Sequence, residues 1–219
     1  MHLSRWIKDP FCGLSHWFGA GLSVAGLVFL LLISKGPGWH AAVLALYGTS
    51  LIVLYVSSAL AHSVKCSQRL EDRLTRLDYA AIFLLIAGTY TPVCTIAVGG
   101  AWGWGIVIGE WTLAAIGIPL VLLGRGTSNL ARTILYLCMG WLGVFAAVPV
   151  LHALSMSGIL WLLAGGAAYS IGAVIFVTDR PNLWPGRFHA HDLWHSLVLV
   201  GSVCHFILIL SFVASAAHN

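Results

Sequence analysis

Two histidines four residues apart, His191 and His195, lie at the start of the last hydrophobic run of the chain. On a helix, residues at positions i and i+4 share one face and lie about one turn apart. Polar side chains are uncommon in segments this apolar, and those that occur tend to be functional. A pair of imidazoles at this spacing is a well-attested way to hold a transition metal. The pair predicts part of a metal site, whose remaining ligands must come from elsewhere in the chain.

The composition indicates the environment of such a site. The chain has 219 residues, of which 59% are hydrophobic and 8% are charged, and its mean hydropathy is +0.93. A soluble domain carries about 25% charged residues. Backbone groups in lipid must be satisfied internally, and the apolar runs are long and do not alternate. We therefore expect an integral membrane protein made of spanning helices.

Seven runs reach the length that is needed to cross a bilayer. We predict an all-α membrane protein, a seven-transmembrane-helix bundle that forms a single domain over residues 1–219 in the cell membrane. The connections are short, which favours a compact bundle. The predicted helices cover about 14–34, 41–63, 79–98, 104–123, 132–151, 159–178 and 191–215.

The lysines and arginines predict the orientation of the bundle. With seven spans, Lys35 falls on one side and all other basic residues fall on the opposite side, which the positive-inside rule places in the cytoplasm. We therefore expect the N-terminus in the cytoplasm and the C-terminus outside. The net charge of +4 is accounted for by this anchor, so no nucleic-acid partner is expected. The residues on the predicted inner side are Arg5, Lys8, Lys65, Arg69, Arg73, Arg76, Arg125, Arg132, Arg180 and Arg187.

The same topology brings polar residues from different helices to one depth, near the predicted inner surface. These residues come from the start of the first, third and seventh runs and from the end of the second. Side chains that are far apart in sequence could therefore meet within one leaflet. In chain order they are Asp9, His16, Ser58, His62, Asp78, His191 and His195.

Three of these residues, His62, His191 and His195, predict a zinc site with its fourth position open. This ligand count is typical of catalytic zinc, whereas structural sites are closed. Asp78 could offset the charge of the ion and take a proton from a water molecule. Ser58 could hydrogen-bond that water or a substrate carbonyl group. This chemistry suggests hydrolysis of an amide or ester bond in a membrane lipid.

Other polar residues are given smaller roles. The five cysteines are scattered without a CxxC pair, so we expect free thiols, with neither a disulfide framework nor a cysteine-based metal site. His205 lies ten residues beyond His195, about 15 Å away by helical rise. We expect it to be a buried hydrogen-bonding residue. Asp192 is expected to cap the last helix or to pair with Arg187, and Glu110 in the fourth run is assigned no role.

Three short motifs carry a resemblance to a known family. Ser58-x-x-x-His62, Leu77-Asp78-Tyr79 and His191-x-x-x-His195 resemble the motifs of the hemolysin III / progestin and adipoQ receptor (PAQR) family. The stretch Ile86-Ala-Gly-Thr-Tyr-Thr-Pro92 and the tail Gly201…His205-Phe206 resemble its bacterial hemolysin III branch. The resemblance covers essentially the whole chain.

This resemblance implies a zinc ion near the cytoplasmic leaflet, held by the histidines at positions 62, 191 and 195. It also implies that Asp78 is the carboxylate that contacts water and that Ser58 is the serine of the second helix. Asp9 and His16 match polar positions of the first helix and are expected to act behind the ligands. Alkaline ceramidases of the wider superfamily have similar zinc sites, which implies hydrolysis of lipid amides. The chain departs from the family at Cys12, where asparagine is usual, at Asp9, where glutamate is usual, and at Tyr79, where the bacterial branch often has histidine.

Three other functions stay open at this stage. The first is a membrane-state sensor in which a structural zinc clamps the second and seventh helices, and the second is a pore-forming cytolysin, as the family name suggests. The third is a b-type cytochrome with His62 and His195 as haem ligands. No continuous polar stripe favours a pore, and three histidines suit a single ion better than haem, so no haem is expected. We expect a membrane lipid as substrate or ligand, and the sequence leaves the oligomeric state open.

Overall fold

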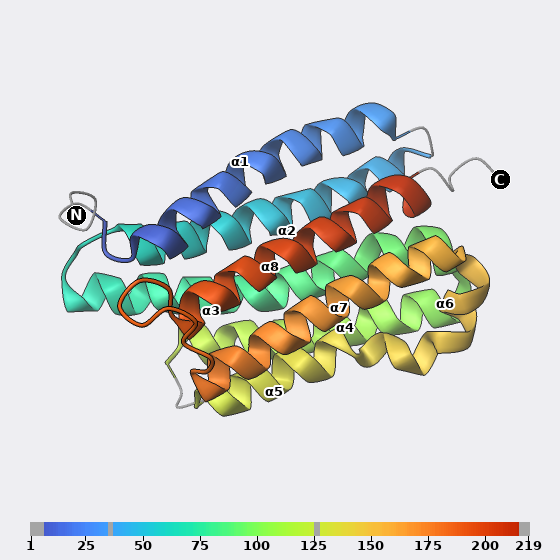
Figure 1. Ribbon diagram of the computed structural model, residues 1–219. Helices are drawn as coiled ribbons and strands as arrows, with labels where there is room; N and C mark the ends of the chain where they lie inside the picture. The colour runs from blue at the N-terminus through green and yellow to red at the C-terminus, as the bar shows by residue number, and fades with distance from the viewer. Residues whose placement is uncertain (1–6, 35–36, 125–127, 215–219) are drawn as a thin grey trace.

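The computed structural model describes residues 7–34, 37–124 and 128–214. Within these ranges, seven helices are long and apolar enough to cross a membrane, and they form one bundle (Figure 1). The predicted seven-helix architecture is confirmed, and the chain is a multi-pass membrane protein. The seven spans are Pro10–Ile33, Gly38–Ser63, Gln68–Val98, Gly100–Leu122, Asn129–Ala153, Met156–Thr178 and Ala190–Val213.

Several helices begin earlier than the hydropathy of the sequence predicts. Helix α1 spans Pro10–Ile33 and starts with a proline, which suits the first helical turn because that position needs no backbone N–H. Helix α3 spans Gln68–Pro92, so the charged residues before position 79 belong to its first turns. Hydropathy missed these turns because they carry charged side chains. The acidic Glu71 in the first turn also complements the helix dipole.

Proline residues coincide with irregular helical geometry in two spans. Helix α3 changes to a π-helix, Val93–Val98, directly after Pro92. The fifth span consists of α5 (Asn129–Gly140), a 3₁₀ turn (Leu142–Ala146) and α6 (Ala147–Ala153), which contains Pro149. A proline lacks the N–H group and crowds the carbonyl four residues earlier, so an α-helix gives way near it. Pro119, by contrast, lies inside the continuous helix α4 (Gly100–Leu122).

Helices that are adjacent in sequence pack side by side, and α8 closes the bundle. Helix α2 (Gly38–Ser63) packs between α1 and α3, and α7 (Met156–Thr178) packs along α8 (Ala190–Leu208). Helix α8 also contacts α1 (Figure 1). The first and last helices therefore lie side by side, and the starts of α1 and α8 lie close to the end of α2.

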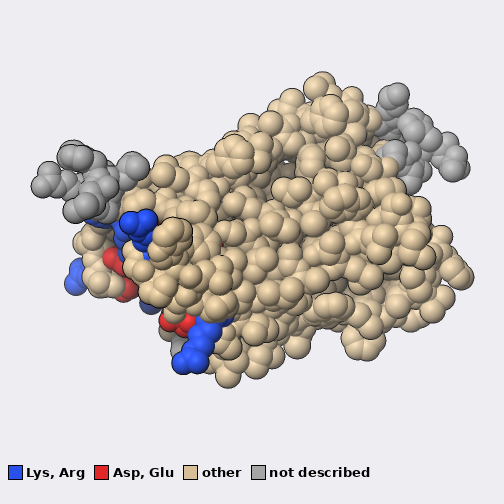
Figure 2. All heavy atoms as spheres, viewed as in Figure 1, with Lys and Arg blue, Asp and Glu red and all other residues tan. Residues whose placement is uncertain are grey.

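The surface is apolar along the length of the bundle and charged at one end. On the face that Figure 2 shows, every blue or red side chain lies at the left end of the molecule. We call this the charged end; it holds the described basic residues Lys8, Lys65, Arg69, Arg73, Arg76, Arg132, Arg180 and Arg187. Arg5, Lys35 and Arg125, which the orientation argument also used, lie outside the described residues. A cytoplasmic location of the charged end stays a prediction.

Glycine at position 117 allows α4 to pack closely against α3. A Cβ atom added at Gly117 would lie 2.3 Å from the ring of Phe83, which is 1% exposed. We expect Gly117→Ala to destabilise the folded protein by about 1–3 kcal/mol because the buried ring has little room to move. Thermal unfolding in detergent measures this effect. Gly105→Ala in the same helix, where the added carbon meets no atom within 4 Å, is the matched control, and equal melting temperatures of the two variants would contradict the prediction.

Candidate metal centre

The first turn of α8 is fixed by a capping box. The Asp192 carboxylate accepts a hydrogen bond of 2.8 Å from the backbone N–H of His189, and the His189 side chain accepts one from the third helical residue. The expectation that Asp192 caps this helix is confirmed. The cap sets the direction in which His191 and His195 leave the helix.

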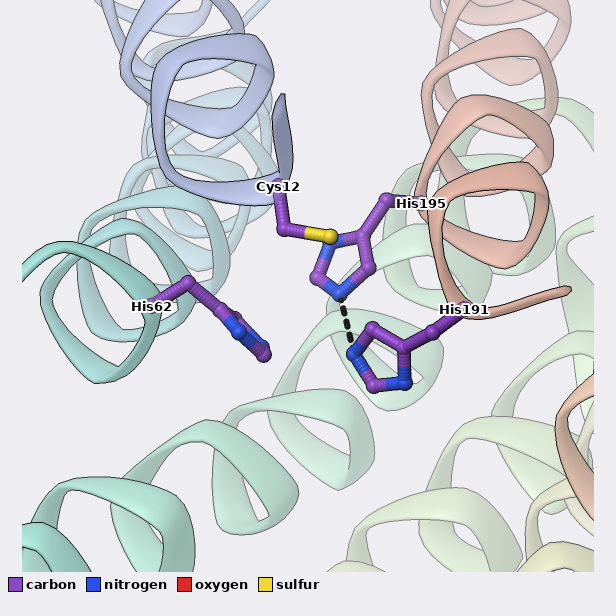
Figure 3. Close-up of side chains that lie close together, drawn as sticks. All are labelled: Cys12, His62, His191 and His195. Atoms are coloured by element: carbon purple, nitrogen blue, oxygen red, sulfur yellow. Dashed lines mark hydrogen bonds between the residues drawn. The ribbon is translucent and has the colours of Figure 1, made fainter. Parts of the chain in front are cut away.

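Four side chains from three helices converge next to this turn (Figure 3). They are Cys12 from α1, His62 from α2, and His191 and His195 from α8, and one potential ligand atom of each lies within 4.8 Å of all the others. The ring centroid of His195 lies 4.6 Å from that of His62 and 4.7 Å from that of His191. The Nε2 atoms of His191 and His195 are 2.9 Å apart. We call these four residues the imidazole–thiol cluster.

Two more side chains hold the histidines from behind. The Asp9 carboxylate lies 3.0 Å from Nδ1 of His62, and His16 Nε2 lies 2.9 Å from Nδ1 of His195. In both histidines the partner occupies Nδ1, so Nε2 is free to face the cluster. Metal-bound histidines are commonly oriented in this way by a partner on the second nitrogen. The structure thus brings Asp9 and His16 to the positions expected of residues that act behind the ligands.

Asp78 and Ser58 lie beside the cluster. The Asp78 carboxylate is 3.9 Å from Nε2 of His62, and its side chain is 13% exposed. Ser58 is one turn before His62 on α2 and is buried. Both residues line a cavity that also reaches His62 and His195. All seven predicted site residues are therefore gathered at one place, although the sequence separates them by up to 186 positions, from Asp9 to His195.

The position of Cys12 corrects the sequence analysis. No disulfide forms among the described cysteines, as expected, but Cys12 lies among the candidate metal ligands, where the sequence predicted no cysteine. Cys12 is buried, and its thiol donates a 3.2 Å hydrogen bond to the Asp192 carboxylate. Cysteine spacing does not reveal this position, because the neighbours of Cys12 come from α2 and α8. A usable signal was its spacing of four residues before His16, which places both on one face of α1.

The donor set fits a metal ion. Imidazole suits zinc and several other transition metals, and thiolate selects zinc or copper(I) among them. Histidine nitrogen and cysteine sulfur are common ligands of such ions, and polar side chains inside an apolar bundle tend to be functional. The imidazole–thiol cluster can therefore hold a transition-metal ion.

A cavity of about 180 Å³ extends from the cluster into the bundle. Apolar side chains form much of its lining, among them Leu54, Ile82, Leu85 and Trp194. At the charged end, Lys8 lines the cavity and forms an ion pair of 2.5 Å with Glu71. The hydrogen bond to Glu71 raises the pKa of Lys8, so the ammonium group stays charged at neutral pH. The cavity therefore joins a charged mouth, a polar cluster and an apolar interior.

Comparison with known proteins decides the family. A family model described as "Haemolysin-III related" matches residues 4–206. The chain belongs to this family. The resemblance that the motifs at Ser58–His62, Leu77–Tyr79 and His191–His195 indicated is thereby confirmed.

Relatives within the haemolysin-III-related family include bacterial and plant proteins. The chain is 37% identical to "Hemolysin-3" of Bacillus cereus over 98% of its own length and 96% of that protein. It is 34% identical to "Hemolysin-3 homolog" of Bacillus subtilis (strain 168), over 94% and 95% of the two chains. "Heptahelical transmembrane protein 5" of Arabidopsis thaliana is 33% identical over 74% of this chain and 47% of its own. The name of the plant protein agrees with the seven helices seen here.

Proposed function

We propose that this haemolysin-III-related protein is a zinc-dependent hydrolase that cleaves an amide or ester bond in a membrane lipid. The observation that carries the proposal is the position of three imidazoles and one carboxylate at the end of an apolar cavity. The imidazoles suit a metal ion, the carboxylate suits proton transfer, and the cavity suits a hydrocarbon chain. A lipid could reach such a site with its tail in the bundle and its polar group at the cluster.

The residues of the site would have four different roles in hydrolysis. His62, His191 and His195 would hold the ion, which when bound acts as a Lewis acid and lowers the pKa of water toward about 7. Asp78, 3.9 Å from His62, would receive the proton of the attacking water and return it to the leaving group. Ser58 would donate a hydrogen bond to the carbonyl oxygen of the substrate. Asp9 and His16 would keep the rings of His62 and His195 in place.

The fourth position decides between this proposal and a second one. The thiolate, and not the thiol, binds metals, and in this structure the Cys12 thiol donates its hydrogen to Asp192. A Cys12 that keeps this hydrogen bond when the ion is bound would leave a three-histidine site with room for water. If Cys12 instead bound the ion, one cysteine and three histidines would close the site and clamp α1, α2 and α8 together. The protein would then be a sensor of the membrane state with a structural zinc.

Cobalt substitution distinguishes these two states. We expect the protein loaded with Co²⁺ to show the visible bands of an imidazole site without the near-ultraviolet charge-transfer band of a cobalt–thiolate bond. The spectrum of Cys12→Ser should match that of the wild type. A charge-transfer band that disappears in Cys12→Ser would establish the closed site and favour the sensor.

The hydrolase proposal is tested directly by lipid turnover. Purified protein in lipid nanodiscs should release fatty acid from at least one class among ceramides, acyl-amino lipids, glycerolipids and phospholipids, as measured by mass spectrometry. The activity should disappear after treatment with a chelator and return when zinc is added. A protein that retains zinc and consumes no lipid in any of these classes would overturn the proposal.

A further inference from the structure

The end of the cavity that lies away from the imidazole–thiol cluster is also polar. His205 of α8 and Tyr169 of α7 line this end. His205 follows His195 by ten residues on the same helix, which places it about 15 Å deeper in the bundle. Between these two ends, the lining includes the apolar side chains of Leu54, Leu85 and Val198. A chain that fills the cavity would thus cross an apolar region and meet a second polar group.

The ring of His205 is held in one orientation. A Cβ atom at Gly165 of α7 would lie only 2.3 Å from the ring, so the glycine makes the space that the imidazole fills. Nε2 of His205 lies 3.3 Å from the carbonyl oxygen of Leu162. A carbonyl can only accept, so Nε2 carries the hydrogen and Nδ1 of the neutral ring is an acceptor. No hydrogen-bond donor to Nδ1 is found among the described residues.

Tyr169 supplies a second polar group at the same place. Its hydroxyl lies 2.8 Å from the Ser202 hydroxyl, and its ring centroid is 5.5 Å from that of His205. A Cβ atom at Gly201 would lie 2.8 Å from the tyrosine ring, so this ring is also seated in a glycine-lined space. Two rings that can both form hydrogen bonds are therefore fixed at the distal end of the cavity.

We propose that His205 and Tyr169 form a subsite for a hydroxyl group on the hydrocarbon chain of the ligand. This inference rests on the proposed function, because it assumes that the cavity holds the chain of a lipid. A plain alkyl chain would leave the acceptor of His205 without a partner in apolar surroundings, which is unfavourable. A hydroxyl group far along the chain would donate to Nδ1 of His205, beside the ring of Tyr169, which lines the same cavity. The protein would therefore select lipids whose chain is hydroxylated over otherwise identical lipids.

A matched pair of fatty acids tests the subsite without any turnover. Ricinoleate differs from oleate by one hydroxyl group far along the chain. Binding of each is measured with purified protein in nanodiscs, by displacement of a fluorescent fatty acid. We expect the wild type to bind ricinoleate roughly three- to tenfold more tightly, which corresponds to one net hydrogen bond.

Variants assign the preference to the subsite. His205→Phe keeps an aromatic ring but removes the acceptor, and it should bind the two fatty acids equally. His205→Gln retains an acceptor and should recover part of the preference, whereas Tyr169→Phe should reduce it. His152→Phe on α6, where the histidine is exposed, is the control and should behave as the wild type. Zinc content and melting temperature of each variant report whether the fold is intact.

Two results would overturn the inference. Equal binding of ricinoleate and oleate to the wild type would show that water, and not a ligand hydroxyl, donates the hydrogen bond to Nδ1 of His205. A preference that persists in both His205→Phe and Tyr169→Phe would place the recognition elsewhere. Neither result bears on hydrolysis, which is measured separately by turnover, so failure of the subsite and failure of the hydrolase are distinguishable.

Discussion

Purified protein with His191→Ala is expected to bind zinc more than about 100-fold more weakly than the wild type. Loss of a residue that only orients a ligand already costs about 10–100-fold in metal affinity, and His191 supplies one of the converging nitrogens itself. The loss should also lower the melting temperature, because an ion at 100 times its dissociation constant stabilises a folded protein by about 2.7 kcal/mol. Metal analysis and thermal unfolding measure both effects.

The control for this variant is His152→Ala, which removes an exposed histidine of α6. It should bind zinc and unfold as the wild type does. Chelation of the wild type should lower its melting temperature to that of His191→Ala and leave the variant unchanged. Full zinc occupancy in His191→Ala would contradict the assignment of this residue as a ligand.

The second large effect is expected for Asp78→Asn, which keeps the size of the side chain but removes its ability to take up a proton. General-base catalysis contributes about 10²–10⁴-fold to a rate, so the rate of lipid turnover should decrease by a factor in that range. Because Asp78 lies 3.9 Å from His62 and is not a member of the imidazole–thiol cluster, zinc should still bind. The measurement is turnover per bound zinc.

Asp72→Asn is the matched control in the same helix. Asp72 is exposed and accepts a hydrogen bond from Gln68, so its substitution should leave turnover unchanged. A protein in which Asp78→Asn turns over lipid at the rate of the wild type would exclude this carboxylate as the base. If both variants lost zinc, the defect would lie in the fold of α3.

The polar contacts around the imidazole–thiol cluster hold its histidine rings in fixed orientations. On the face that Figure 2 shows, the charged side chains lie at one end of the bundle, and the histidines of the imidazole–thiol cluster lie near that end. Each ring nitrogen that does not face the cluster has a partner in His62 and His195. The rings are thus fixed before any ligand arrives, which lowers the cost of assembling a reactive site.

Much of the architecture could be predicted from the sequence because hydropathy is a local property. An apolar run of about twenty residues must form a helix in lipid, whatever its neighbours are. The number of helices follows from this rule. The alternation of helix direction then places His62, Asp78 and His191 at one depth. The start of α3 was less predictable, because its first turns carry charged residues.

The sequence by itself determined that the chain forms seven membrane helices and that its polar residues gather at one depth. Only the tertiary structure decided which of those residues touch. The packing of α1 against α2 and α8 brings Cys12 into the histidine cluster and directs its thiol to Asp192. Helical periodicity fixes the depth and face of a side chain, but the rotation of one helix against another depends on packing across the whole bundle. For the same reason, the glycine that seats His205 on α7 could be recognised only in the folded protein.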